Sequence, residues 1–421
     1  MDIVASYRRV IDTPDMVQGS PEDISPTRFG KIVDLLKASG RTDCCVRGNE
    51  PTAHAEFERL LAIAEKGRIR VHVETCGLLT AEARRLLEDR PLPVILKLYR
   101  PSVYEPGQLE EVAAAIGAIN AAYPDRLRVC AVIDDLMQPL DYIESFVGEV
   151  GARSVAFRIV CPKELDQLRA FTGDFVPVVT GLGTTGVRVS LECGLPPCVF
   201  SDADYGALAK LDCLPMRCLP QPGVLPDLRV FHCWSLISRA TGNLGAFRQT
   251  GQALDFLFST FADAQCDLRP FADCTACPSA SSEACVGPCL ALKLERIEED
   301  VARLRTRVED DATQEDLVQL GVRYWQLRKF SEARDCLVEA RRGDPGNGGV
   351  HLMLGRVYHR LGDLAGMEEE YEKAARLSRE PAPVLAELGR AFGAVGKAGK
   401  ARKVLARLSA LEAEAQSHQR V

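Results

Sequence analysis

Four of the 16 cysteines in this 421-residue chain lie within one segment of sixteen residues. The run is Cys274-x2-Cys277-x7-Cys285-x3-Cys289, on a stretch that also contains proline, serine and glycine. Four thiolates on a loop that can curl around an ion are the donor set of a zinc site or an iron–sulfur cluster. The spacing therefore predicts a metal site, and the alternative is a group of small buried apolar side chains.

Further cysteines precede this run and extend the candidate ligand set. Between residues 191 and 290 the regular apolar periodicity fades, while proline, glycine and cysteine become more frequent. A loop-rich region buries little apolar surface, so a bound metal is a physical expectation. Two four-thiolate sites, or one complete site with thiols left over, could form from Cys193, Cys198, Cys218, Cys233, Cys274, Cys277, Cys285 and Cys289.

The other cysteines and two histidines have simpler interpretations. We expect core packing for five cysteines in or beside apolar segments, namely Cys44, Cys45, Cys130, Cys161 and Cys336. Cys76 ends a predicted strand on the presumed ligand face, so a functional role is open there. His54 and His232 lie beside motif residues, but a lone histidine is more often a hydrogen-bonded core residue.

The elements that must position these side chains alternate along residues 1–190. Short apolar runs predict strands at Ile3–Ser6, Cys44–Arg47, Ile69–Thr75, Val94–Leu98, Leu127–Ile133, Ser154–Val160 and Val176–Thr180. Amphipathic segments predict helices at Pro26–Ala38, Ala55–Lys66, Ala81–Leu87, Gln108–Ala122, Leu140–Val150 and Pro162–Phe171. Strands that are apolar on both faces and alternate with helices indicate a parallel sheet.

This alternation predicts an α/β fold, either a partial or complete (β/α) barrel or a doubly wound open sheet. Gly48-Asn49-Glu50-Pro51 follows the second strand, and Thr75-Cys76-Gly77 follows the third. Both turns thus lie at the carboxyl ends of strands, where parallel α/β folds place their ligand sites.

A repeat of 34 residues occupies the end of the chain. Leu320-Gly321, Leu354-Gly355 and Leu388-Gly389 recur at this spacing, with aromatic residues in step three residues after each glycine. The period and the small residues where two helices would cross resemble the tetratricopeptide (TPR) repeat. Three units suffice for a stable stack, whose concave surface implies a peptide or protein partner.

The first two strands and their turns resemble the start of a radical S-adenosylmethionine (SAM) enzyme. In that family a C-x-x-x-C-x-x-C loop after strand one holds a [4Fe-4S] cluster, and a Gly-Gly-Glu-Pro-like turn after strand two contacts SAM. Here the aligned ligand positions are Arg9, Thr13 and Met16, which supply no thiolate. The resemblance therefore implies a vestigial SAM turn at Gly48–Pro51, leaves SAM binding open, and does not predict reductive SAM cleavage.

The cysteine-rich region resembles the SPASM or twitch extension of radical SAM peptide-modifying enzymes. There a cysteine pair flanking a hairpin precedes a C-x2-C-x5-C-x3-C run that holds auxiliary clusters. This chain has seven residues at the middle spacing, and it lacks the family's final cysteine unless Cys266 substitutes. The resemblance implies iron–sulfur clusters of the 4Fe-4S type, with zinc as the alternative.

Four segments follow from these patterns. We predict a degenerate radical SAM-like barrel at 1–190, a SPASM/twitch-like region at 191–290, a helical connector at 291–311 and three TPR repeats at 312–421. The net charge of −7, without a lysine/arginine block, argues against nucleic-acid binding. No apolar run approaches the ~18 residues of a membrane span, so we expect a cytoplasmic protein without a membrane partner.

Two functional hypotheses follow. In the first, the chain is a catalytically degenerate radical SAM/SPASM-like protein that binds a peptide or protein in a modification pathway, such as the maturation of a ribosomally made peptide, beside an active modifying enzyme. In the second, it is an enzyme that uses an auxiliary iron–sulfur cluster or non-radical chemistry in the barrel. The first is favoured because no acid–base or nucleophile pair stands out in the barrel segment.

Overall fold

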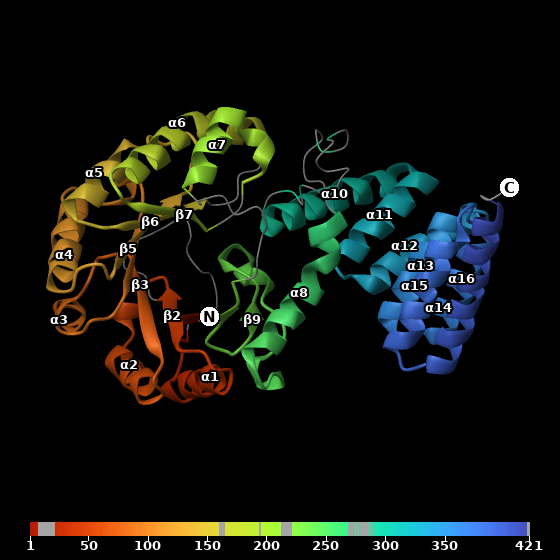
Figure 1. Ribbon diagram of the computed structural model, residues 1–421, viewed down its shortest axis with the longest axis horizontal. Helices are drawn as coiled ribbons and strands as arrows, with labels where there is room; N and C mark the ends of the chain where they lie inside the picture. The colour runs from red at the N-terminus through yellow and green to blue at the C-terminus, as the bar shows by residue number, and fades with distance from the viewer. Residues whose placement is uncertain are drawn as a thin grey trace. The chain divides into compact units, whose positions relative to one another are not determined.

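The computed structural model of the chain divides into two compact units, Met1–Lys293 and Leu294–Val421 (Figure 1). The residues that it describes are 1–6, 22–159, 165–192, 195–211, 221–267 and 289–418, together with Cys274, Cys277, Cys285 and Gly287.

The first unit is built on one mainly parallel sheet whose neighbouring strands run in the order β7-β6-β5-β4-β3-β2-β1-β8-β9. Strands β1 to β8 are parallel to their neighbours, and β9 is antiparallel to β8. The strands are β1 (Asp2–Ser6), β2 (Asp43–Gly48), β3 (Arg70–Thr75), β4 (Val94–Leu98), β5 (Leu127–Ile133), β6 (Ser154–Ile159), β7 (Arg188–Leu191), β8 (Gly223–Val224) and β9 (Val230–Phe231).

Helices connect the strands and form an arc outside the curved sheet, as Figure 1 shows for α2 to α6. They are α1 (Pro26–Ala38), α2 (Phe57–Lys66), α3 (Ala81–Asp89), α4 (Gln108–Ala122), α5 (Asp141–Glu149), α6 (Leu165–Thr184), α7 (Asp202–Lys210) and α8 (Thr250–Asp267). Hydroxyl groups cap several of them, since Ser25 accepts from the Arg28 amide and Thr80 from the Ala83 amide.

The strand order decides between the two predicted architectures. From β1 to β7 each strand pairs with the next one in sequence, and the order never reverses as it does in a doubly wound sheet. The predicted α/β fold is therefore confirmed in its partial-barrel form. Strands β8 and β9, which come from the predicted cysteine-rich segment, continue this sheet beyond β1.

The predicted strand at Val176–Thr180 is wrong, because these residues lie inside α6. The buried residues of α6 include Leu168, Phe171, Phe175 and Val179, at spacings of three and four. That spacing is helical, and the apolar run at Val176–Thr180 is its last part rather than a strand. The seventh strand is instead β7, and the helix predicted at Pro162–Phe171 continues to Thr184.

The second unit is a stack of helix pairs, as the repeat predicts. After α10 (Leu290–Asp311) the pairs are α11 (Gln314–Gln326) with α12 (Phe330–Gly343), α13 (Gly348–Leu361) with α14 (Leu364–Leu377), and α15 (Pro381–Ala394) with α16 (Ala398–His418). Small residues occur where the helices of a pair touch. A Cβ added at Gly321 would lie 2.7 Å from Leu337, and one at Gly355 would lie 2.7 Å from Tyr371.

Across the part of the chain that the structure describes, no helix combines the length and apolarity needed to cross a membrane.

Candidate functional site

The turn after β2 is held by the carboxylate of Glu50, which is 1% exposed. Its Oε1 accepts hydrogen bonds from the amide and hydroxyl of Thr52, at 3.1 and 2.6 Å. Its Oε2 accepts from the Thr75 hydroxyl at 2.9 Å and from the Cys76 amide and thiol at 2.9 and 3.0 Å. Both oxygens are thus used by the chain itself, and the carboxylate joins the turn after β2 to the turn after β3.

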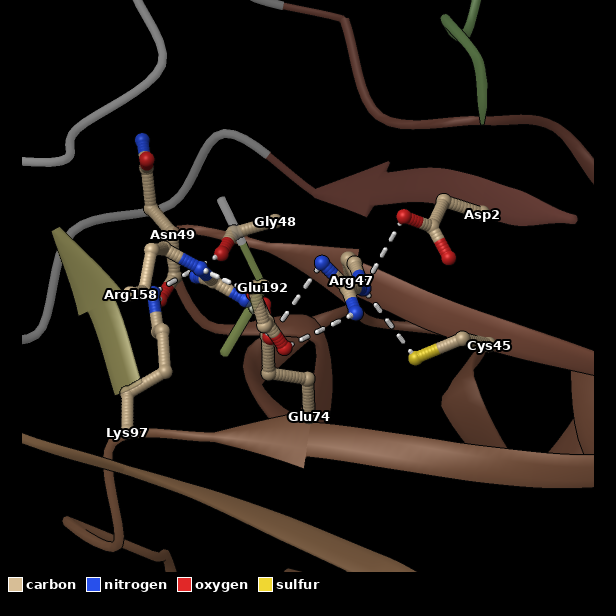
Figure 2. Close-up of polar contacts among 9 residues, drawn as sticks. All are labelled: Asp2, Cys45, Arg47, Gly48, Asn49, Glu74, Lys97, Arg158 and Glu192. Carbon is tan, nitrogen blue, oxygen red and sulfur yellow. Dashed lines mark hydrogen bonds and ion pairs between the residues drawn. The ribbon is translucent and has the colours of Figure 1, made fainter. Parts of the chain in front are cut away.

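A lysine of β4 contacts the backbone of the same turn. Lys97 is 1% exposed, and its Nζ donates to the carbonyl oxygens of Gly48 and Asn49 at 3.2 and 3.3 Å. Figure 2 shows Lys97 reaching the turn, while the side-chain amide of Asn49 points away from the charged groups below it. A side chain of this protein therefore supplies an ammonium group to the predicted SAM-contacting turn.

A network of buried charges lies on the concave face of the sheet beside this turn (Figure 2). Arg47 places Nε 3.2 Å from Asp2 Oδ2 and Nη1 3.6 Å from Glu74 Oε1. Arg158 donates to Glu74 and Glu192, both at 2.7 Å. No side chain of the five is more than 14% exposed. The network thus holds two arginines and three carboxylates, and the ammonium of Lys97 lies at the neighbouring turn.

The ionisation of these groups follows from burial and from their partners. Burial alone would raise the pKa of Glu192, but Arg158 and Arg47 lower it to about 2. Burial alone would lower the pKa of Arg47, but Asp2 and Glu74 raise it well above the ordinary value. The pKa of Asp2 is raised, because burial outweighs its attraction to Arg47. The network therefore keeps Glu192 charged, whereas Asp2 is protonated more readily than an ordinary aspartate.

Sequence reasoning missed this network, although a signal was present. Arg47, Lys97 and Arg158 each stand within a strand of apolar neighbours, and Glu74 does so in β3. A charged residue inside a buried strand must be paired or must bind something, because an isolated buried charge is costly. Such residues on several strands of one parallel sheet predict a shared interior cluster.

The thiols of Cys76 and Cys45, near this site, are buried. Burial and the Glu50 carboxylate raise the pKa of Cys76, whose Sγ donates to that carboxylate. Burial also raises the pKa of Cys45 to about 12, and its Sγ accepts from Arg47 Nε at 3.3 Å. Because a thiolate is the reactive form, burial and the hydrogen bond to Glu50 disfavour Cys76 as a nucleophile.

The predicted vestigial turn is thereby located, but the predicted cluster positions before it are not. Arg9, Thr13 and Met16 lie outside the described residues, as do Cys193 and Cys218.

The remaining predicted metal ligands come from three separated segments. Cys198 is exposed, and Cys289 is buried at 6% exposure. Burial raises the pKa of the Cys198 thiol, and the neighbouring Cys285 and Cys274 raise it further, so these three thiols share one neighbourhood. Within the described part of the chain no three metal-binding side chains have a geometry that would hold an ion. The eight-cysteine ligand set thus stays a prediction.

The two histidines of the sequence analysis differ. His54 is structural, because Nε2 is 2.9 Å from the Ile24 carbonyl oxygen and Nδ1 accepts from the Glu56 amide at 2.9 Å. His232 is 1% exposed and contacts the ring edge of Phe261, and neither ring nitrogen has a hydrogen-bond partner among the described residues. Burial lowers the pKa of His232 to about 4.

A tetratricopeptide repeat model matches residues 349–381, which span α13 and α14. None of the curated proteins matches the chain by sequence.

Solved structures resemble the chain at low sequence identity. Native anSMEcpe with bound AdoMet and Kp18Cys peptide aligns with a TM-score of 0.50 at 13% identity, covering 74% of this chain and 98% of its own. Native anSMEcpe with bound AdoMet aligns with a TM-score of 0.50 at 15% identity, covering 73% and 98%. Streptococcus suis SuiB bound to S-adenosylmethionine gives a TM-score of 0.49 at 14% identity, covering 70% and 73%.

At this identity the likeness concerns the fold alone. It confirms the predicted resemblance to radical SAM enzymes of the SPASM class, followed by a TPR region. In this sheet the Glu50 turn, Glu74, Arg158 and Glu192 lie at or near the carboxyl ends of their strands, and Asp2 begins β1.

Proposed function

We propose that this chain is a catalytically degenerate radical SAM/SPASM-like protein that binds a peptide or protein partner in a peptide-modification pathway. Its fold resembles that of peptide-modifying enzymes, and a TPR repeat follows it. The activity is recognition of the partner, and the barrel serves as a scaffold rather than a site of SAM cleavage.

The observation that carries this proposal is that groups of the chain itself already form hydrogen bonds with the polar atoms of the turn at Gly48–Pro51. The carbonyls of Gly48 and Asn49 accept from Lys97, and both carboxylate oxygens of Glu50 accept from neighbouring groups of the chain. A ligand with an amino group would have to displace a buried lysine, which loses its hydrogen bonds in doing so. The turn is therefore suited to holding the sheet edge together.

Two further observations agree with it. The sequence has Arg9, Thr13 and Met16 where the family's cluster ligands would align, and none of these residues forms a thiolate. In addition, the concave face beside the turn carries arginines and carboxylates that pair with one another, as Arg158 does with Glu74 and Glu192. Because these side chains are buried and paired with one another, they do not form an accessible acid–base pair of the kind that catalysis needs.

The cysteine region contributes an auxiliary cofactor in this proposal. Cys198, Cys233, Cys274, Cys277, Cys285 and Cys289, with Cys193 and Cys218, supply thiols for 4Fe-4S clusters or for zinc. Cys274 and Cys285 lie near enough to Cys198 to raise the pKa of its thiol, although the described side chains do not have the geometry of a metal site. When bound, the metal group would cross-link a loop-rich region that buries little apolar surface.

The proposed partner is a peptide or a protein carrying one. Stacked TPR repeats form extended concave binding surfaces, and anSMEcpe has been solved with a bound peptide. An active modifying enzyme is the second candidate for the same surface, since a degenerate relative would act beside one.

Reductive cleavage of SAM tests the degenerate character. The chain, purified anaerobically and incubated with SAM and a strong reductant, should form no 5′-deoxyadenosine above a no-enzyme control. Formation of that product would overturn the proposal and favour an active enzyme. Iron, sulfide and zinc analysis of the same sample tests the cofactor, because a preparation with neither iron nor zinc would contradict the cysteine assignment.

Co-purification tests the partner. The full chain should retain a second protein or a peptide that is lost when the chain is truncated after Asp311, at the end of α10. The control is the same capture with Gly393→Ala, which alters a repeat helix without a steric contact. Equal recovery with the truncated chain would assign binding to the first unit and not to the repeats.

A further inference from the structure

A cavity of about 760 Å³ opens at the amino ends of β3 to β7, the edge of the sheet opposite the Glu50 turn. Arg70 begins β3, Arg188 begins β7, and Arg128 is the second residue of β5. Because side chains alternate along a strand, Arg70 shares the face of Glu74, and Arg188 shares the face of Glu192. The cavity thus lies on the same concave face as the charge network, at the other end of the strands.

The side chains that line this cavity carry an excess of positive charge. Arg70, Arg126, Arg128 and Arg188 all line it, whereas Asp125 is the single acidic lining residue in the described chain. Asp125 is already paired with Arg153 at 3.0 Å, outside the cavity. The acidic groups of the charge network do not line the cavity, so they offer no direct partner inside it.

The four arginines differ in their hydrogen-bond and ion-pair partners. Arg126 donates its guanidinium hydrogens to backbone carbonyls, including those of Ile119 and Leu87, so its role is structural. Arg128 donates to the Ser190 hydroxyl at 2.8 Å, and its buried Nε has no hydrogen-bond partner among the described residues. Arg70 and Arg188 are both exposed and have no ion pair in that same part of the chain, although Asp43 is the cross-strand partner of Arg70.

The interior of a closed eight-stranded (β/α) barrel is filled by branched apolar side chains that pack against one another. The amino end of this partial barrel has a different composition. Here Ile95, which belongs to a buried cluster with Cys45, Cys130 and Ala156, supplies apolar wall, while arginines and serines occupy the mouth. Guanidinium groups gathered in a concave site are the usual means of binding phosphate and carboxylate groups.

We propose that this cavity binds a small organic anion with more than one acidic group, held by Arg70, Arg128 and Arg188. Its volume falls within the ~300–1,000 Å³ typical of small-molecule sites. The Ser190 hydroxyl adds a polar contact, and the ring of Tyr123, which is 36% exposed and backed by Arg126, offers an apolar surface at the rim. This site is separate from the proposed degenerate SAM turn and does not depend on it.

Isothermal titration calorimetry of the full chain with inorganic pyrophosphate and, separately, with citrate tests the proposal. We expect saturable binding of at least one probe, weakened about tenfold or more by Arg70→Gln or Arg188→Gln, because each loses a charge-assisted hydrogen bond. Preference for one probe assigns the acidic group as phosphate or carboxylate. The matched control is Arg85→Gln, which removes the same charge from a side chain that is 85% exposed on α3.

Thermal unfolding of each variant checks that it is folded. Arg70 and Arg188 are both exposed, so each can be substituted independently of the other with little effect on the core. The absence of saturable binding for both probes would overturn the proposal. So would an equal loss of affinity in Arg85→Gln, since that result would reflect net charge and not this cavity. Either result would leave the SAM-cleavage and co-purification tests unaffected.

Discussion

The ammonium of Lys97 lies 3.2 Å from the carbonyl oxygen of Gly48. This contact links β4 to the turn after β2, although β3 lies between these strands in the sheet. Lys97 is almost completely buried, so the hydrogen bonds to Gly48 and Asn49 offset part of the cost of removing its charge from water.

Replacement of this lysine should destabilise the first unit. Lys97→Met keeps much of the side-chain volume but leaves two buried carbonyls without this donor, which costs about 1–3 kcal/mol. Urea denaturation followed by circular dichroism measures the change. Lys66→Met, at the exposed end of α2, is the matched control and should shift the free energy of unfolding by less than about 0.5 kcal/mol. Equal effects would show that the Lys97 contacts contribute nothing specific.

Arg158 should be the most sensitive position of the charge network. Arg158→Met would leave Glu74 and Glu192 buried without this cation, and breaking a buried pair in this way costs about 3–5 kcal/mol. Chemical denaturation of Arg158→Met and of Arg153→Met, an exposed arginine just before β6, provides the comparison. Adding Glu192→Gln to Arg158→Met should recover part of the loss, and strictly additive effects would contradict a coupled network.

The stability of the first unit should depend on pH through Glu192. Its pKa in the folded protein is about 2, against an ordinary value of 4.5, so its contribution is complete above pH 4.5. That contribution is lost as the pH falls from 4.5 towards 2, and integrates to roughly 3 kcal/mol. Unfolding titrations should therefore show a steeper fall for the wild type than for Glu192→Gln. Glu82→Gln, which removes an exposed carboxylate from α3, controls for the loss of one charge.

Two glycines of the repeats should respond to alanine in opposite directions. In Gly355→Ala the new methyl would lie 2.7 Å from the Tyr371 ring, and such overpacking costs about 1–3 kcal/mol. In Gly393→Ala the methyl meets no atom within 4 Å, so the higher helix propensity of alanine should stabilise α15 by about 1 kcal/mol. Thermal unfolding monitored at 222 nm distinguishes them, and a destabilised Gly393→Ala would contradict the packing assignment.

Much of the fold could be predicted because its signals are local. The strands at Val94–Leu98 and Leu127–Ile133 and the helices at Pro26–Ala38 and Gln108–Ala122 have the predicted bounds. The prediction of a strand at Val176–Thr180 was wrong, and the reason is also local. A short apolar run fits either a strand or a buried helix, and only its continuation from Leu168 to Leu182 reveals the helical spacing.

The candidate site was predicted less completely. The turn at Gly48–Pro51 was identified from its residues, and Cys76 was expected on the same face, but Lys97 and the Glu50–Cys76 hydrogen bonds were not predicted. A turn can be found from adjacent residues, whereas the groups that satisfy its polar atoms come from other strands.

By itself the sequence determined the alternation of strands and helices, the 34-residue repeat and the thiols available for a metal, since each depends on residues close together along the chain. The tertiary structure alone decided that Asp2, Arg47, Glu74, Arg158 and Glu192 form one buried network of charges and that arginines of three strands line one cavity. Both follow from strand order and register, which bring side chains from distant segments onto one face of the sheet.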